Sequence, residues 1–390
     1  MTRSPTPMLS ALAVFVVLFA VAVGARWYES RFEVELVVEA SLDLGESELS
    51  GLRTGKCFSP DGSVFFDARG STVQAWIVDD RPGTDDDRAI HAWKDTYGGS
   101  DVALASREVQ GPRMRPAVEL AVLAKQKKTI RFFRFHHTPG GVGFADESFS
   151  VEYPLDAHDL GEAVRIAYRP RSDEFLVFFE SGQAKRFSIS AEGEVQGIQW
   201  FRSEAARKRG TAPADSLRLH GGSIDDAAFS PDGRVLATVN RSRDRFVSVV
   251  SLLDETVVKT PPIVDDVYYS VGVSARGDRI AAARGKGPID VFRRAEEGWT
   301  LAQRLPTAEG DKAEIGLAFA GEGREIVAVS HHEVHVWHLD TGRMLRSFES
   351  EDGDQIQAWS VTNDDDDADT RLLLVDKHGM LRGWEFTPDR

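Results

Sequence analysis

After Arg31 the hydrophobic residues come in short runs that are separated by turn residues, with almost no helical periodicity. The runs are rich in Val, Ile, Phe and Trp, a composition typical of strands. Segments 57–66 and 228–237 share one layout, in which a Ser-Pro-Asp-Gly turn separates two apolar runs. Pro presets φ at about −65°, Asp accepts nearby backbone hydrogen bonds and Gly tolerates positive φ. Each segment therefore predicts an antiparallel hairpin.

Weaker copies of this layout recur along the whole chain. The turns fall near positions 62, 113, 173, 233, 277, 323 and 369, which gives seven units of roughly 44–60 residues, the period of a propeller blade. Each unit continues with a third predicted strand that often ends in an aromatic residue. These third strands are 72–76, 129–133, 184–187, 246–250, 289–292, 334–337 and 381–384.

With these repeats the chain resembles the WD-repeat family of β-propellers over nearly everything after Arg31. The family's Gly-His element has a reversed counterpart in His220-Gly221, and its Trp-Asp dipeptide is degenerate at Trp76, Trp337 and Trp384. The sequence therefore does not predict the family's His/Asp/Ser/Trp hydrogen-bond tetrad reliably. The resemblance implies an all-β fold, a seven-bladed β-propeller of four-stranded blades.

The last unit contains only three predicted strands, at 356–361, 372–376 and 380–386. Segment 32–38 alternates apolar and polar residues and is left over at the N-terminal side. We expect 31–42 to supply the outer strand of the last blade, which closes the ring of a domain spanning 31–390 and removes an open sheet edge.

Residues 8–25 form an almost wholly apolar run without charge, preceded by a short tail at 1–7 and followed by a linker at 26–30. Eighteen helical residues rise about 27 Å, enough to cross the hydrocarbon core of a bilayer. We predict a transmembrane signal-anchor helix, with the lipid bilayer as its partner and Trp27 and Tyr28 at the interface. The propeller would then lie on the extracytoplasmic side of a single-pass membrane protein. The alternatives are secretion after signal cleavage near Ala22 and an inverted, cytoplasm-facing anchor.

The charge balance and the cysteine count exclude some classes of function. The chain has 47 Lys and Arg against 62 Asp and Glu, a formal net charge of −15, which argues against nucleic acid as a partner. Cys57 is the single cysteine, so no internal disulfide forms. Nine of the aspartates fall in tracts within 79–87 and 364–367, which we interpret as solvated loops because no calcium-loop pattern is present.

No residue is predicted to be catalytic, to bind a cofactor or to hold a metal. The segment 331–335 is not a His-Glu-x-x-His motif and falls at a strand turn, so we interpret it as a surface hairpin tip. No Gly-x-Ser-x-Gly elbow occurs, and Cys57 sits in an apolar strand where inert packing is expected. We therefore expect no cofactor.

The candidate partner-binding residues lie in two long insertions, 79–111 and 189–222. They are Trp93, Tyr97, Arg202, Arg207, Lys208 and Arg209, the last four in a short basic segment with helical character. The leading hypothesis is a membrane-anchored, non-catalytic propeller scaffold that binds protein partners or envelope components through its loops. The alternative is an extracytoplasmic propeller enzyme, a lactonase-type or quinoprotein-like hydrolase or oxidoreductase, with a metal on the channel axis.

Overall fold

A computed structural model describes the chain in segments that leave out the N-terminus and several loops. The described residues are 34–42, 55–69, 72–78, 90–96, 102–110, 116–125, 129–138, 141–143, 150–155, 160–190, 192–200, 214–241, 244–285, 287–306, 316–349, 355–363 and 370–386. The predicted tail, anchor helix and linker (1–7, 8–25 and 26–30) lie outside them. Within the described segments, no helix is long and apolar enough to cross a membrane.

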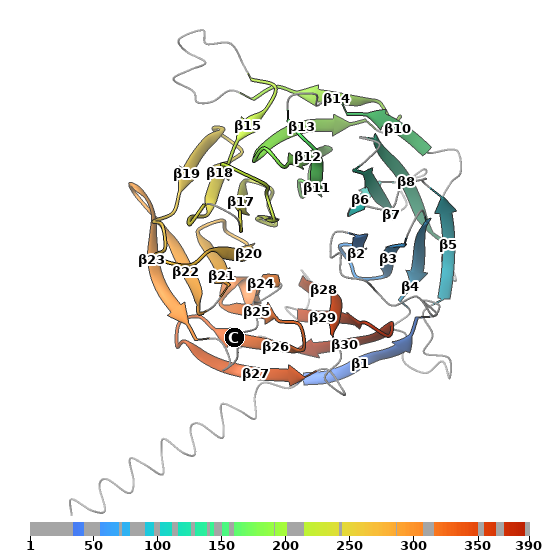
Figure 1. The fold of residues 1–390 in the computed structure, drawn as a ribbon. Coiled ribbons are helices and arrows are strands. Elements are labelled where there is room, and N and C mark those ends of the chain that lie inside the picture. The colour runs from blue at the N-terminus through green and yellow to red at the C-terminus, as the bar shows by residue number, and fades with distance from the viewer. Residues whose placement is uncertain are drawn as a thin grey trace, which may run out of the picture.

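The described strands form seven antiparallel sheets arranged as blades around a common centre (Figure 1). From the centre outward, blade 1 consists of β2 (Lys56–Phe58), β3 (Val64–Arg69), β4 (Thr72–Ile77) and β5 (Ile90–Thr96). Blade 2 consists of β6 (Val102–Gln110), β7 (Pro116–Ala124), β8 (Thr129–Thr138) and β10 (Ser150–Pro154), with β9 (Gly141–Gly143) also paired to β8. Blade 3 consists of β11 (Ala163–Tyr168), β12 (Glu174–Phe179), β13 (Gln183–Ile189) and β14 (Val195–Ile198), with β15 (Leu217–Arg218) also paired to β13.

The second half of the ring repeats the same order. Blade 4 consists of β16 (Asp226–Phe229), β17 (Val235–Val239), β18 (Ser248–Ser251) and β19 (Thr256–Lys259). Blade 5 consists of β20 (Tyr268–Val273), β21 (Arg279–Arg284), β22 (Ile289–Ala295) and β23 (Gly298–Leu305). Blade 6 consists of β24 (Gly316–Ala320), β25 (Glu325–Val329), β26 (Glu333–His338) and β27 (Arg343–Glu349), with the 3₁₀ turn η3 (Gly321–Gly323) after β24.

Blade 7 joins the two ends of the described chain. Its inner strands are β28 (Ile356–Asn363), β29 (Thr370–Asp376) and β30 (Met380–Phe386), and its outer strand is β1 (Val34–Ser41). β1 runs antiparallel to β30, from Val34 opposite Phe386 to Ser41 opposite Met380. The prediction of an all-β, seven-bladed propeller with four-stranded blades is confirmed.

The repeated turns have the chemistry that the sequence predicts. Gly62 and Gly233 close the two Ser-Pro-Asp-Gly turns with φ of 75° and 68°, in the left-handed region that favours glycine. The Ser59 hydroxyl accepts a hydrogen bond of 2.9 Å from the Val64 backbone N–H, and Ser230 accepts one of 3.0 Å from Val235. The serine side chain thus holds the beginning of the second strand at the end of the first.

The hydrophobic core is divided among the junctions between blades. Seven buried clusters are present in the described residues, and each contains side chains from two neighbouring blades. The cluster that closes the ring brings Phe65 and Trp76 of blade 1 against Leu373 and Val375 of blade 7. Because both faces of a middle strand are covered, strands such as β17 and β25 are buried throughout and mostly apolar.

One junction also contains a buried ionic network. Glu119 of β7 is 0% exposed and accepts hydrogen bonds of 2.8 Å from Nε of Arg107 and 2.8 Å from Nε of Arg134. The hydroxyl of Tyr168, on β11 of blade 3, donates to the same carboxylate over 3.0 Å. Burial and the neighbouring Glu119 charge raise the pKa of Tyr168. The network therefore links blade 2 to blade 3, because the Glu119 carboxylate binds two arginines of blade 2 and the Tyr168 hydroxyl of blade 3.

Blade 4 contains a network of hydrogen bonds around a histidine, which the repeats in the sequence do not predict. His220 lies just before β16, and its Nδ1 is 3.0 Å from Oδ2 of Asp244 while its Nε2 is 3.0 Å from Oγ1 of Thr238. The imidazole stacks on Phe246 with ring centroids 5.5 Å apart. The imidazole of His220 therefore packs within blade 4. The backbone N–H of the next residue, Gly221, also donates a hydrogen bond of 2.7 Å to Asp244.

Candidate functional site

Most of the residues predicted to bind a partner lie outside the described residues. These are Tyr97, Arg202, Arg207, Lys208 and Arg209. Trp93 is on β5, at the outer edge of blade 1, where its backbone is opposite Ala75 of β4. The aspartate tracts at 79–87 and 364–367 also lie outside the described residues.

The histidine segment 331–335 begins in the turn between β25 and β26 and continues along β26, so only its first two residues form the predicted hairpin tip. His331 and His332 form the turn, and their rings are 6.3 Å apart. His335 is buried on β26, with Nε2 3.3 Å from Oε2 of Glu333. Across the described segments, no three His, Cys, Asp or Glu side chains come together as a group that could hold a metal ion.

The described surface carries its large exposed apolar side chains on the outer parts of blades 4 to 6. Val264 and Leu253 are 76% and 70% exposed, and the others lie on the outer strands β19, β23 and β27. These five side chains are Leu253, Val258, Val264, Leu301 and Met344. We call this region the rim. Water-exposed apolar side chains that gather in one region are typical of surfaces that bind another molecule.

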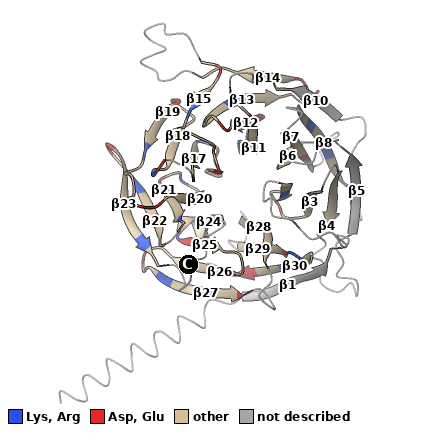
Figure 2. Cartoon of the chain, viewed as in Figure 1, with Lys and Arg blue, Asp and Glu red and all other residues tan. Residues whose placement is uncertain are grey.

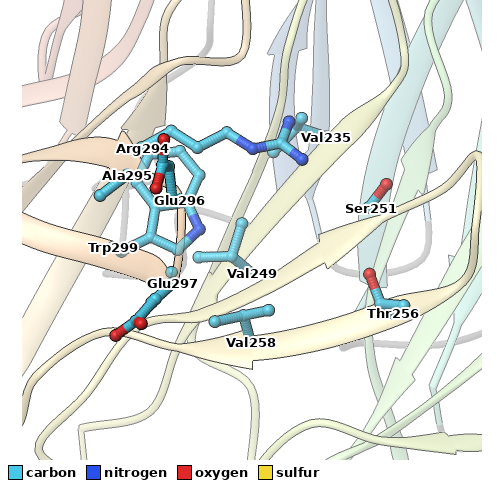
Figure 3. Close-up of a pocket in the computed structure, with 11 residues that line it drawn as sticks. Val235, Val249, Ser251, Thr256, Val258, Arg294, Ala295, Glu296, Glu297 and Trp299 are labelled. Carbon is cyan, nitrogen blue, oxygen red and sulfur yellow. The ribbon is translucent and has the colours of Figure 1, made fainter.

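A groove of about 310 Å³ lies at the rim between blades 4 and 5 (Figure 3). Its apolar wall is formed by Val235, Val249 and Val258 of blade 4 and by Trp299 of β23. The charged side chains of the β22–β23 hairpin, Arg294, Glu296 and Glu297, border it. Ser251 and Thr256 border its other end in Figure 3. The groove thus combines an apolar wall with charged groups at its margin.

The local sequence explains why this groove is open. β19 has four residues whereas β23, the outer strand of the next blade, has eight, so β23 extends past the end of β19. Gly298 begins β23 with φ of 137°, a value that a residue with a side chain rarely adopts. This glycine turns the chain so that Trp299 packs inward, against the cluster shared by blades 4 and 5.

A second cavity of about 310 Å³ lies on the same rim. Pro261, Pro262 and the exposed Val264 line it together with Leu301 of β23. At its base Asp290 is buried and accepts hydrogen bonds from the Tyr268 hydroxyl over 2.8 Å and from Nε of Arg284 over 2.9 Å. Nε of Arg304 donates to the other carboxylate oxygen over 3.1 Å. Burial and the Asp290 charge raise the pKa of Tyr268.

The outer edges of blades 5 and 6 are each interrupted by a β-bulge. Along β23, Gln303 is opposite Val291 and Leu301 is opposite Phe292, so Ala302 is an extra residue. Along β27 the register shifts in the same way and leaves Leu345 as the extra residue. Such bulges disrupt the edge that an added strand would need. The rim is therefore suited to contacts through side chains.

Sequence reasoning missed this rim because its signal is weak. An apolar run normally predicts a buried strand, yet Pro261-Pro262-Ile263-Val264 follows β19 as a loop. Two consecutive prolines cannot donate backbone hydrogen bonds, so this run cannot continue a ladder. That combination, an apolar run that cannot form a central strand, is the feature that points to exposed apolar surface.

These observations define the protein as a seven-bladed β-propeller with an apolar groove at the rim of blades 4 and 5. A comparison with known proteins finds no family model that matches the chain and no curated protein that matches it.

Proposed function

We propose that this protein is a non-catalytic, membrane-anchored scaffold that binds a protein partner through the rim of blades 4 to 6. The observation that carries the proposal is the gathering of Leu253, Val258, Val264, Leu301 and Met344 on that region. A single exposed apolar side chain needs no explanation. Three of these five line the two rim cavities, Val258 the first and Val264 and Leu301 the second, and so present apolar surface that gains by being covered.

The chemistry of the groove indicates what kind of segment it suits. Its wall of Val235, Val249 and Trp299 fits an apolar anchor side chain, the kind of group that dominates binding energy at protein interfaces. Glu296 and Glu297 at the margin favour a basic residue beside that anchor. The bulged edges of β23 and β27 disfavour a partner that binds by adding a strand.

The apolar segment 8–25 supports the membrane anchor. Only nine positions separate Ala25 from Val34, where β1 begins, a span of at most about 32 Å. An anchor in this place would hold the propeller near the lipid surface and leave its outer face available to another membrane or envelope protein. We expect the protein to stay in the membrane fraction on alkaline extraction and to keep its N-terminus intact. A periplasm-dependent reporter fused to the C-terminus should be active.

Photo-crosslinking of the full chain in its native membrane tests the rim. Val264→Asp and Leu301→Asp place a charge on the apolar surface, and Gln196→Asp places the same charge on β14, the outer strand of blade 3. We expect the unmodified chain and Gln196→Asp to give the same cross-linked partner, and the two rim variants to lose at least roughly nine-tenths of it, because burying an unpaired charge is costly. Equal cross-linking by all four chains would refute the rim as the binding surface.

Metal analysis of the purified chain addresses the alternative, an extracytoplasmic propeller enzyme with an axial metal. The scaffold proposal expects no stoichiometric Ca²⁺ or Zn²⁺. A metal bound at one equivalent per chain would overturn the non-catalytic proposal and favour an enzyme with a metal on the channel axis.

A further inference from the structure

A separate cavity of about 300 Å³ lies on the inner wall of the ring, away from the rim. Its lining comes from the innermost strands of four consecutive blades, β2, β6, β11 and β16; Figure 1 labels β2, β6 and β11 beside the centre. Among the described lining residues are two cations, Lys56 and Arg165, and no acid. The cavity therefore contains two cationic side chains, of which Arg165 is paired with Asp226 and Lys56 lies opposite Asp67 of β3.

Both cations are held in place by residues of neighbouring blades. Nζ of Lys56 donates to Oε1 of Gln357 on β28, over 3.2 Å. Nη1 of Arg165 forms an ion pair with Asp226 on β16 and donates to the Asp225 carbonyl over 3.2 Å. Side chains that are fixed before binding lose less conformational entropy when a ligand arrives.

The Asp226 carboxylate is also bound on its far side. It accepts hydrogen bonds from the Ser270 hydroxyl over 2.8 Å and from the Val271 backbone N–H over 3.0 Å. Blade 5 therefore shares this carboxylate with Arg165. In the segments that the structure describes, Nε and Nη2 of Arg165 have no hydrogen-bond partner. A guanidinium with a nitrogen pair available matches the two oxygens of a carboxylate.

Most of the remaining lining is apolar, and Cys57 and the large side chain of Tyr168 complete it. Ala103 and Ala105 of β6, Ala167 of β11 and Ala227 of β16 leave the space open, and Leu104 and Ile166 add apolar surface. The Ser106 hydroxyl donates to the Phe58 carbonyl over 2.6 Å and so supplies no donor to a ligand. A cavity of this volume is at the lower end of the range for small-molecule sites.

From this geometry we infer that the inner wall of blades 1 to 4 binds a small carboxylate with a compact apolar body. The carboxylate lies against Arg165 and Lys56, and the apolar body lies along the alanine wall. The site is independent of the proposed partner-binding rim, because its lining shares no residue with the two rim cavities.

Isothermal titration of the purified full chain with benzoate, a carboxylate with a compact apolar ring, tests the site. We expect saturable one-to-one binding. Lys56→Gln removes one charge and Arg165→Lys keeps the charge but removes the planar nitrogen pair. Each should weaken benzoate affinity roughly tenfold or more, the value of one charge-assisted hydrogen bond. Ala167→Leu fills the cavity without changing its charge and should weaken affinity at least as much.

Arg218→Gln is the matched control, since Arg218 is an exposed cation of blade 3 outside the cavity. It should bind benzoate with unchanged affinity, and so should the rim variant Leu301→Asp, which separates this test from that of the proposed function. Absence of saturable binding to the native chain, or equal affinity in all variants, would overturn the inference. Inorganic phosphate that binds as tightly as benzoate would overturn the assignment of an apolar carboxylate.

Discussion

The rim groove and the inner cavity have nearly the same volume, about 310 and 300 Å³, but they are built differently. Four innermost strands line the inner cavity, whereas two blades and a charged hairpin line the groove. The inner cations are each fixed by a partner from another blade, Gln357 or Asp226. Arg294, Glu296 and Glu297 at the groove are exposed on a hairpin turn. The two cavities therefore differ in how their charged side chains are held rather than in volume.

Charged residues are spread over the described blades (Figure 2), and their buried and exposed members differ in the same way. Glu119 and Asp290, each at most 1% exposed, have arginine partners at distances below 3.2 Å. Exposed pairs such as Arg245 with Asp265, at 3.8 Å, contribute little because water screens them. Substitutions of buried charged side chains should therefore affect stability far more than those of exposed ones.

Replacing Glu119 with Ala should have the largest effect on stability. The substitution leaves Arg107 and Arg134 without their shared carboxylate and Tyr168 without its acceptor, and breaking a buried ion pair costs about 3–5 kcal/mol. Urea unfolding of the full chain gives this difference. Glu297→Ala, on the exposed hairpin, is the control and should change the free energy of unfolding by less than about 0.5 kcal/mol. Similar losses in both variants would contradict the contrast between buried and exposed charged side chains.

The reactivity of Cys57 gives the second test. Burial raises the pKa of its thiol from 9.0 to about 12. Because the thiolate is the nucleophile, alkylation of the native chain at pH 8 should be about a thousandfold slower than that of the urea-unfolded chain. In a Cys57→Ser background, Leu253→Cys at the exposed rim should be alkylated at nearly the unfolded rate. Labelling of native Cys57 at nearly the unfolded rate would contradict the raised pKa of its thiol.

The fold was predictable because its signals are local and repeated. A Ser-Pro-Asp-Gly turn gives the same hairpin at Gly62 and Gly233, wherever it occurs along the chain. Seven such units and a leftover strand leave few ways to complete the ring, and β1 does pair with β30.

The candidate sites were not predictable in the same way. The inner cavity gathers Lys56, Ser106, Arg165 and Ala227 from four blades, and no spacing along the chain indicates that they meet. The groove depends on the unequal lengths of β19 and β23, which propensity alone does not determine. His220 shows the same limit, because its partner Asp244 is recognisable only once the loop between β17 and β18 is folded.

Glycine substitutions give a third test, with smaller effects. A Cβ added to Gly316, on the innermost strand β24, would lie 2.1 Å from Cζ2 of Trp359 in blade 7. Gly316→Ala should therefore destabilise the fold by about 1–3 kcal/mol, the usual cost of overpacking. Gly197 lies on the outermost strand β14 and has no atom within 4 Å of its added Cβ. Gly197→Ala should leave the melting temperature unchanged or raise it, and a loss equal to that of Gly316→Ala would contradict the difference between inner and outer strands.

The smallest expected effect concerns blade 4, which contributes Ala227 to the inner cavity and Val235 to the groove. Burial lowers the pKa of His220, and the charge of Asp244 only partly opposes this shift. The unfolded chain therefore binds a proton at this position more readily than the folded chain, so the contribution of His220 to stability is complete above about pH 6.5 and is lost as the pH falls.

Stability measured by urea unfolding between pH 7.5 and pH 5 should decrease, and His220→Gln should reduce that slope while lowering stability at pH 7.5. His378→Gln is the matched control, since His378 is exposed in the turn between β29 and β30. It should retain the slope of the unmodified chain. If His220→Gln leaves the slope intact, the pH dependence of stability arises elsewhere. Protonation of His220 would then not affect the stability of blade 4, which contributes to both cavities.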